Sequence, residues 1–285
     1  MTEPALPVPT TESGAAGLAA ILDRPREALL AFDYDGVLSP IVDDPGQARP
    51  YSRSMAALSR LAVHVGAIVV ITGRPAEEVA TLACFADLPE LGELVVYGHY
   101  GRERWDAGSR SVTAPPEPTA VARARAELAP LLATIGVHDA NIEDKGSSLA
   151  VHTRQSADPD GTLQRLRRPL AEFAARHGLI VEPGRLVLEL RPPGVDKGAA
   201  LRRHVAERSA TVVSYAGDDL GDLTAFAAVE ALRDEAVAGL KICSGSAEAS
   251  PEVAKRADLV VDGPTGIADF LEALLASLTQ RSPYR

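Results

Sequence analysis

Short runs of aliphatic residues recur along the chain and predict the strands of a parallel β-sheet. Each run is continuously apolar rather than alternating, which is the pattern of strands that helices cover on both faces. Stretches predicted to be helical lie between the runs, and this alternation is typical of an α/β, doubly wound, Rossmann-like fold. The predicted strands are 28–34, 67–73, 94–98, 211–217 and 258–262, and the predicted helices are 52–64, 76–83, 197–207, 220–228 and 266–278.

The middle of the chain has a different pattern, because a Pro-rich segment at 111–119 interrupts the alternation of strands and helices. Two helices are predicted after it, at 120–135 and 162–177. The stretches SSLAVHTR and RLVLELR alternate between polar and apolar residues, as strands with one exposed face do. EPGR, before the second of them, predicts a hairpin turn. The expected domains are an N-terminal tail at 1–25 that leads into a short helix, a core of 26–109 and 196–285, and an inserted α+β module at 110–195.

The net charge of −10 argues against a general nucleic-acid-binding protein, which usually has a basic face. It does not exclude a phosphorylated small molecule, because a local pocket can be positive in an acidic protein. The N-terminus has no basic residue before Arg24, and no apolar run approaches the roughly 20 residues that span a bilayer. We therefore expect a monomeric cytoplasmic protein without nucleic-acid or membrane partners.

Polar residues follow three of the predicted strands, at the edge of a parallel sheet where ligands bind. A further polar residue, Lys197, stands at the start of a predicted helix, where the helix dipole disfavours an exposed lysine. The other residues are Asp33 and Asp35 after the first strand, Thr72, Gly73 and Arg74 after the second, and Asp218, Asp219 and Asp222 after the fourth.

These residue types suit phosphoryl transfer. Two carboxylates at one strand end repel each other unless a cation such as Mg²⁺ offsets their charge, and Asp218 supplies a third oxygen ligand. A carboxylate held beside Mg²⁺ and a lysine stays ionised and can attack phosphorus, which is the role we expect for Asp33. Asp35 can protonate the leaving alcohol and then activate water. Thr72 and Lys197 can bind the phosphate oxygens that are not transferred.

Four motifs follow one another along the chain, namely DYDGVL, ITGR, a later lysine before a helix, and GDDLGD. The chain resembles the haloacid dehalogenase superfamily of phosphatases, because these motifs have the order found there. The resemblance implies that Asp33 is the nucleophile and that Asp35 is the general acid and base. It implies that Mg²⁺ is held by Asp33, by the main-chain carbonyl of Asp35 and by Asp218, with support from Asp219 or Asp222. The insertion resembles the α/β cap of that superfamily.

Within the superfamily, residues 97–103, 142–154, 184–201 and 215–226 are similar to trehalose-6-phosphate phosphatases. In that family the cap reads sugar hydroxyls through residues that match Glu143, Lys145 and Glu189 here, and the resemblance adds Gly73, Arg74 and His99 to the substrate site. Further residues in or beside family motifs are His152, Arg154 and Arg191. The chain departs from the family in two places: Gly221-Asp222-Leu223 replaces Thr-Asp-Glu, and GHYG replaces a motif with Asn-His-Gly.

The resemblance implies hydrolysis of trehalose 6-phosphate, the last step of trehalose biosynthesis. Other sugar phosphates are alternatives, namely glucosyl- or mannosyl-phosphoglycerate or a trehalose-like pseudo-disaccharide phosphate, because the cap and not the core selects the sugar. A phospho-acceptor signalling domain is an alternative of another class, although it needs neither an insertion nor Asp35. An Asp-x-Asp pair on its own often only caps a turn, and the cap residues alone could be exposed ion pairs.

Overall fold

A computed structural model describes residues 5–184, 186–246 and 250–281. The chain forms two compact units. The first contains the residues up to Thr113 and those from Asp196 onward, and the second is Ala114–Val195, so the chain leaves the first unit and returns to it once. The first boundary lies close to the Pro-rich segment that marked it in the sequence.

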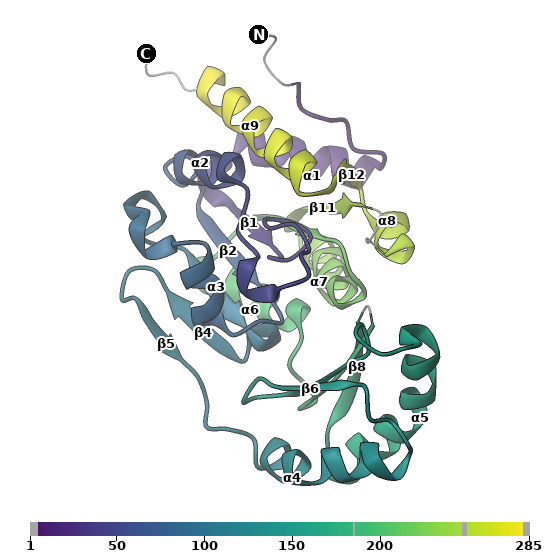
Figure 1. The fold of residues 1–285 in the computed structure, drawn as a ribbon. Helices are drawn as coiled ribbons and strands as arrows, with labels where there is room; N and C mark the ends of the chain where they lie inside the picture. Colours follow the sequence, from purple (N-terminus) through teal and green to yellow (C-terminus); the bar gives the residue numbers. More distant parts are fainter. Residues whose placement is uncertain (1–4, 185, 247–249, 282–285) are drawn as a thin grey trace. The chain divides into compact units, whose positions relative to one another are not determined.

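The first unit is built on an eight-stranded sheet with β1 near its centre (Figure 1). The strands lie in the order β12-β11-β10-β1-β2-β3-β4-β5, and neighbours from β12 to β3 are parallel, whereas β4 and β5 are antiparallel. The bounds are β1 Ala28–Phe32, β2 Ala67–Ile71, β3 Val95–Gly98, β4 Glu103–Asp106, β5 Ser111–Thr113, β10 Val212–Gly217, β11 Ala238–Gly245 and β12 Leu259–Asp262.

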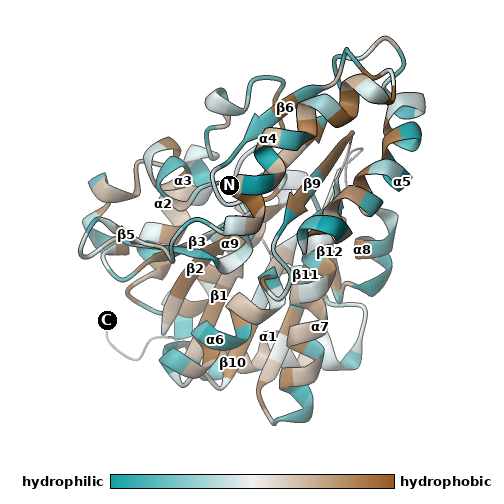
Figure 2. Cartoon of the chain, turned by 90° about the horizontal axis from the view of Figure 1, so that it is seen from below, coloured by the Kyte–Doolittle hydropathy of each residue, from teal (hydrophilic) through white to brown (hydrophobic). Residues whose placement is uncertain are grey.

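Helices cover both faces of this sheet, and this confirms the doubly wound α/β fold. Alternate residues of β1 face opposite layers: Leu30 and Phe32 pack in one hydrophobic cluster, and Leu29 and Ala31 pack in the other. The apolar strands appear brown in Figure 2. None of the described helices is long and apolar enough to cross a membrane. The first layer holds α1 (Glu12–Asp23), α2 (Ser52–Leu61), α3 (Ala76–Leu82) and α9 (Gly263–Arg281), and the second holds α6 (Lys197–Arg208), α7 (Leu223–Asp234) and α8 (Pro251–Arg256).

Strand β11 and the packing of α1 were not expected from the sequence. Lys241 interrupts the apolar run of β11, but its ammonium is buried against the Glu230 carboxylate at 2.7 Å. Helix α1 packs on this strand so closely that a Cβ on Gly17 would lie 1.9 Å from the carbonyl oxygen of Gly239. Part of the segment that we expected to be a tail is therefore built into the first unit.

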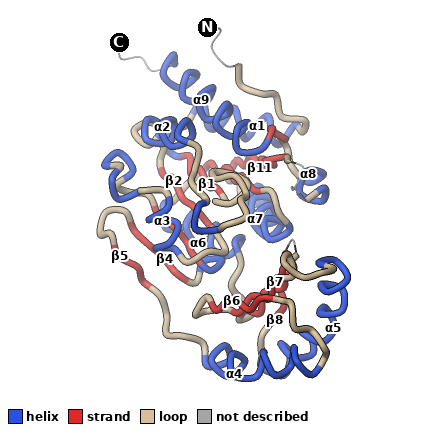
Figure 3. Tube along the Cα trace, in the orientation of Figure 1, coloured by secondary structure: helices blue, strands red, loops and turns tan. Residues whose placement is uncertain are grey.

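The second unit is a four-stranded antiparallel sheet with two helices on one face (Figure 3). The buried face includes Val151 and Leu188, which belong to one hydrophobic cluster with residues of both helices. The predicted turn at EPGR is wrong for its first three residues, because 182–184 continue the strand and pair with 187–189; Arg185 lies outside the described residues. The elements are α4 Thr119–Thr134, β6 Asn141–Asp144, β7 Leu149–His152, α5 Pro159–His177, β8 Ile180–Gly184 and β9 Val187–Arg191.

A buried polar cluster lies between β3, β4 and α6 in the first unit. The hydroxyl of Tyr97 lies 3.3 Å from Nδ1 of His204 and accepts a hydrogen bond from Arg104 at 3.1 Å. Burial, with a smaller effect from the charge of Arg104, lowers the pKa of His204 to about 4, although Glu207 opposes the shift. His204 is therefore neutral in the folded protein at neutral pH.

We expect His204 to make the protein less stable in acid. The His204 side chain takes up a proton near the ordinary histidine pKa of about 6.5 in the unfolded chain and only near pH 4 in the folded protein. Its contribution to stability is therefore full above pH 6.5 and is lost as the pH drops toward 4. This loss amounts to roughly 2–3 kcal/mol. Urea unfolding at several pH values measures it: His204→Phe should flatten the slope, and His138→Gln, at an exposed histidine, should keep it. Equal slopes in the wild type and His204→Phe would refute this account.

Candidate active site

Asp33 lies directly beyond the end of β1 and is buried. Its backbone N–H still pairs with the neighbouring strand, donating to the carbonyl of Ala216 at 2.9 Å, so the sheet fixes its position. One carboxylate oxygen, Oδ1, accepts a hydrogen bond from the N–H of Tyr34 at 2.6 Å. The other, Oδ2, accepts from the ammonium of Lys197 at 2.6 Å. The strand thus ends on a carboxylate with two fixed donors.

The start of α6 positions Lys197. Asp196 caps this helix, because its side chain accepts a hydrogen bond from the N–H of Ala199 at 2.8 Å. The next residue, Gly198, lets α6 approach α7, since a Cβ there would lie 2.3 Å from the carbonyl oxygen of Thr224. Lys197 is buried and donates to Asp33 and also to Asp222, at 2.7 Å. The helix start therefore carries a cation that bridges two carboxylates.

The loop after β10 holds Asp222 through several donors. Its carboxylate accepts hydrogen bonds from the N–H groups of Asp218 and Asp219, at 2.9 and 3.1 Å, and from the hydroxyl of Tyr215, at 2.6 Å. Gly217 makes room for it, because a Cβ there would lie 2.4 Å from Cγ of Asp222. Asp222 is therefore a fixed part of this loop, and its partner Tyr215 was not expected from the sequence.

Three carboxylates meet at this edge of the sheet. Asp33, Asp218 and Asp222 each offer an oxygen, and the three oxygens lie within 4.8 Å of one another. Gly36, with φ of +72°, admits Asp218 at close range, since a Cβ there would lie 2.1 Å from its Oδ2. The three residues expected from two separate strand ends are thus brought together.

The site carries more negative charge than Lys197 can offset. Burial raises the pKa of Asp33 well above its usual range, although Lys197 opposes the shift. Burial and the charges of Asp222 and Asp33 raise the pKa of Asp218 to about 10. Burial alone would lower the pKa of Lys197, but Asp222 and Asp33 outweigh it and raise that pKa well above its ordinary value. A divalent cation would relieve this repulsion, and carboxylate oxygens are suitable ligands for Mg²⁺.

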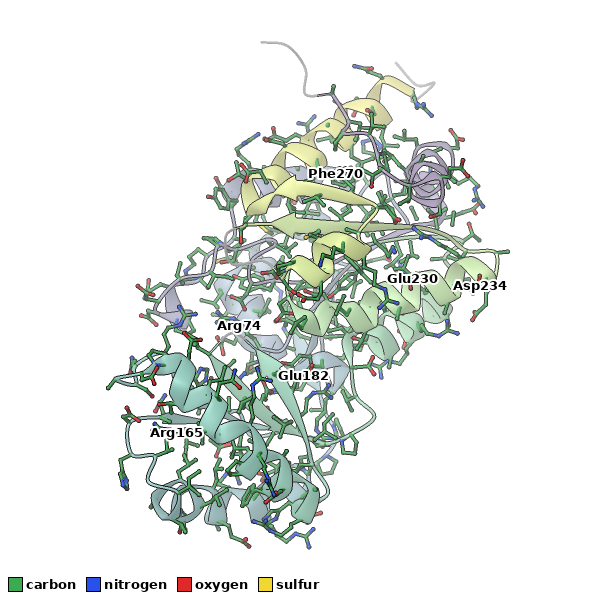
Figure 4. All side chains as sticks on the ribbon, turned by 90° about the vertical axis from the view of Figure 1, so that its right-hand side faces the viewer. Arg74, Arg165, Glu182, Glu230, Asp234 and Phe270 are labelled. Carbon is green, nitrogen blue, oxygen red and sulfur yellow. The ribbon has the colours of Figure 1, made fainter. Side chains whose placement is uncertain are left out.

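The carboxylate of Asp35 pairs with Arg74 rather than with Lys197. The guanidinium donates from Nε and Nη2 to its two oxygens, at 2.6 and 2.8 Å, in a bidentate fork. Arg74, labelled in Figure 4, also binds Glu78 at 2.6 Å. The two aspartates at the end of β1 therefore have different environments, one buried beside an ammonium and one held by a guanidinium.

The loop after β2 carries Thr72 and Gly73 to the same edge of the sheet. Thr72 is buried, its N–H donates to the carbonyl of Tyr97 at 2.9 Å, and its hydroxyl accepts from the N–H of Arg74 at 3.2 Å. His99, expected at the substrate site, is buried with Nε2 3.5 Å from the Glu103 carboxylate. The structure therefore puts His99 beneath the surface of the first unit. Asp219 is exposed and caps the turn at Gly221 with a hydrogen bond of 2.9 Å.

Glu143 and Glu189 share a row of the sheet in the second unit. The row runs from Glu143 through Ala150 and Glu189 to Glu182, by the register of the four strands. Lys145 binds Glu189 at 3.1 Å, and Ser148 donates to the same carboxylate at 2.6 Å. The residues in this row point away from the hydrophobic face. Glu143, Lys145 and Glu182 give this side of the sheet a charged surface, in which the carboxylate of Glu189 is buried.

Two further side-chain contacts extend this surface. His152 lies 2.8 Å from Glu143, and Arg191 pairs with Glu182, which Figure 4 labels. Ser148 and Glu182 were missed in the sequence, but strand alternation could have found Glu182, because it lies opposite Glu189 across the hairpin.

Comparisons with known proteins show which family the chain is similar to. Residues 31–262 match the family model described as Trehalose-phosphatase. The trehalose-phosphate phosphatase of Mycolicibacterium paratuberculosis is 32% identical over 277 residues, which are 93% of this chain and 65% of that protein, so the chain spans about two thirds of its length.

Solved structures share the fold. The C-terminal domain of Candida albicans trehalose-6-phosphate phosphatase matches with a TM-score of 0.75 at 20% identity, covering 95% of this chain and 99% of that one. A haloacid dehalogenase-like hydrolase from Bacteroides thetaiotaomicron matches with a TM-score of 0.61 at 17% identity, covering 86% and 98%. These matches confirm the expected haloacid dehalogenase-like fold. With most of its length matched by the family model, the chain belongs to the trehalose-phosphatase family.

Proposed function

We propose that the protein is an Mg²⁺-dependent phosphatase that hydrolyses trehalose 6-phosphate to trehalose and phosphate through an aspartyl-phosphate on Asp33. The observation that carries this proposal is the buried contact of Asp33 with Lys197, beside the carboxylates of Asp218 and Asp222. The family match and the mycobacterial relative support the substrate.

In the first step, a carboxylate oxygen of Asp33 attacks phosphorus, and the bond between phosphorus and the sugar oxygen breaks. Asp35 gives a proton to that oxygen, so that the sugar leaves as an alcohol. Lys197 and Thr72 donate hydrogen bonds to the phosphoryl oxygens as negative charge develops on them. Asp222 holds the ammonium of Lys197 in place, at 2.7 Å.

In the second step, Asp35 takes a proton from water, and the water oxygen attacks the phosphorus of the aspartyl-phosphate. The bond from phosphorus to Asp33 breaks, which releases phosphate and restores the carboxylate. Asp35 therefore acts as a carboxylic acid in the first step and as a carboxylate in the second. The Arg74 fork holds the carboxylate form, and one of its two hydrogen bonds must break when Asp35 carries the proton.

The carboxylates of Asp33 and Asp218 and the main-chain carbonyl of Asp35 would hold Mg²⁺, with Asp222 supporting them. The fit rests on the three carboxylate oxygens within 4.8 Å and on the raised pKa values of two of these groups. When bound there, Mg²⁺ supplies charge that keeps Asp33 ionised and offsets the charge of the phosphoryl group.

We further propose that the first unit is the catalytic core and that the second is a cap that recognises the sugar. Its charged surface suits a polyol, because Glu143 and Glu189 can accept hydrogen bonds from hydroxyls and Lys145 can donate them. Residues 1–25 are not assigned a role in catalysis.

Phosphate release from a panel of phosphate esters tests this function. The panel contains trehalose 6-phosphate, glucosylphosphoglycerate, mannosylphosphoglycerate, glucose 6-phosphate and p-nitrophenyl phosphate. We expect the highest kcat/KM on trehalose 6-phosphate, with activity lost in EDTA and restored by Mg²⁺. A higher kcat/KM on another sugar phosphate would show that this compound is the substrate and would leave the proposed phosphatase mechanism unchanged. A phosphoprotein that forms without turnover would instead indicate a signalling domain.

The Arg74 fork leads to a prediction about the leaving group. Asp35→Asn should lower kcat/KM on trehalose 6-phosphate, which covers only the steps up to departure of the sugar, by about 10²- to 10³-fold, and Arg74→Met, which frees the carboxylate, by about ten- to a hundredfold. Both losses should be smaller on p-nitrophenyl phosphate, whose leaving group departs without protonation. Steady-state kinetics on the two substrates measures this. Glu78→Gln is the control, because it removes the negative charge of another partner of Arg74 and leaves the fork intact. Equal losses on both substrates would argue against acid catalysis by Asp35.

A further inference from the structure

The turn after β3 has an unfavourable backbone conformation. His99 and Tyr100 have φ values of +46° and +59°, in the left-handed region that residues with side chains rarely adopt. Two such residues in succession persist only where the surrounding structure holds them, and such positions are concentrated at functional sites. We therefore expect this backbone conformation to hold a functional side chain in place.

Three backbone contacts fix this turn to elements of the candidate active site. The N–H of Tyr100 donates to the carbonyl of Thr72 at 2.9 Å, and the N–H of His99 donates to that of Arg74 at 3.0 Å. On the other side, Arg203 of α6 donates to the carbonyl of Gly101 at 2.9 Å. The turn thus joins the loop after β2 to the helix that begins with Lys197.

The ring of Tyr100 lies against two glycines from different loops of the site. A Cβ on Gly73 would lie 2.9 Å from both Cζ and Oη of the phenol, closer than real Cβ contacts allow. A Cβ on Gly221 would lie 3.9 Å from its Cε1. Gly73 follows Thr72 directly, and Gly221 lies in the turn between Asp219 and Asp222. The phenol is therefore packed beside the two loops that supply the polar groups around Asp33.

We propose that Tyr100 is a phosphate-binding residue, whose hydroxyl donates a hydrogen bond to a nonbridging oxygen of the substrate's phosphoryl group. The inference rests on the proposed phosphatase function. A phenol hydroxyl is a neutral donor, and here it lies next to Gly73, one residue beyond the Thr72 side chain assigned to the same oxygens. The strained turn then has a purpose, because an ordinary backbone at Tyr100 would direct the side chain elsewhere.

Tyr100→Phe tests this role, because it removes the hydroxyl and keeps the ring. We expect kcat/KM to fall by about tenfold or more on both trehalose 6-phosphate and p-nitrophenyl phosphate. Inorganic phosphate, used as a competitive inhibitor, should bind more weakly by a similar factor. Tyr100→His, which restores a donor, should recover part of both losses. Thermal unfolding of each variant checks that the fold is kept.

Tyr97→Phe is the matched control, since it removes a phenol hydroxyl three residues earlier in a buried cluster. It should lower stability and leave inhibition by phosphate unchanged. Unchanged kinetics in Tyr100→Phe would overturn the inference. A loss of activity on trehalose 6-phosphate alone, with unchanged inhibition by phosphate, would also overturn it, because that result would indicate contact with the sugar. If the wild type hydrolysed none of the phosphate esters, the proposed function itself would fail, which is a separate outcome.

Discussion

Asp33→Asn is expected to lower phosphate release from every substrate by about 10⁴-fold or more, because the amide of asparagine cannot form the bond to phosphorus that we assign to the Asp33 carboxylate. The fold should survive this change. Lys197 keeps its contact with Asp222, and the substitution removes a carboxylate whose pKa burial raises well above its usual range. We therefore expect the metal-free variant to be as stable as the wild type or more stable.

Phosphate release and urea unfolding, measured on the same samples, check both parts of this prediction. Asp269→Asn is a suitable control, because Asp269 is exposed on α9 and pairs with Arg53 at the surface, where an ion pair contributes about 1 kcal/mol or less. It should change neither activity nor stability by much. Turnover by Asp33→Asn at even a tenth of the wild-type rate would exclude Asp33 as the nucleophile.

Lys197→Met is expected to damage both activity and stability. It removes the cation that Asp33 and Asp222 share, at 2.6 and 2.7 Å, and leaves buried carboxylates to repel one another. The loss of one partner from a buried ion pair costs about 3–5 kcal/mol of unfolding free energy. The loss of a donor to the developing charge should reduce kcat by about 10²-fold or more.

The stability loss in Lys197→Met should depend on pH and on Mg²⁺. A carboxyl whose pKa is raised on folding favours the folded state below its unfolded pKa of about 3.9, and this contribution is lost as the pH rises toward the folded pKa. In the wild type the charge of Lys197 lowers the pKa values of Asp218 and Asp33, so its removal raises both, and the metal-free variant should lose more stability at neutral pH than in acid. Added Mg²⁺ should restore part of it.

Lys241→Met separates the catalytic role of Lys197 from the general effect of losing a buried lysine. Lys241 is also buried and pairs with Glu230 at 2.7 Å, but it lies in β11 outside the candidate active site. The control should lose stability and keep its kcat. If both variants lost activity to the same extent at a temperature where both remain folded, the assignment of Lys197 to phosphate binding would be wrong.

The fold was largely predictable because buried parallel strands are continuously apolar, as in the run that ends at Phe32. Strand β11 was missed for the opposite reason, since Lys241 interrupts its apolar pattern and its burial depends on Glu230, eleven residues away. The packing of α1 could not be predicted either, because it depends on the contact of Gly17 with Gly239 across the fold.

The candidate site was predictable as a set of residues but not as a set of contacts. The ends of parallel strands lie on one edge of a sheet, so the meeting of Asp33 with Asp218 follows from the pattern. The sequence could not show that Arg74 holds Asp35 or that Tyr215 binds Asp222, because such pairings depend on side-chain geometry. For the same reason, Tyr100 gave no signal beyond its place in an unusual motif.

The most direct test of the central claim is to identify the residue that carries the phosphoryl group during turnover. The reaction with trehalose 6-phosphate is quenched with borohydride, which reduces an aspartyl-phosphate to homoserine. Peptide mass spectrometry then locates the homoserine. The account predicts homoserine at position 33, formed only with substrate and Mg²⁺. The account would be contradicted if Asp33 stayed unmodified during turnover and homoserine appeared at another position.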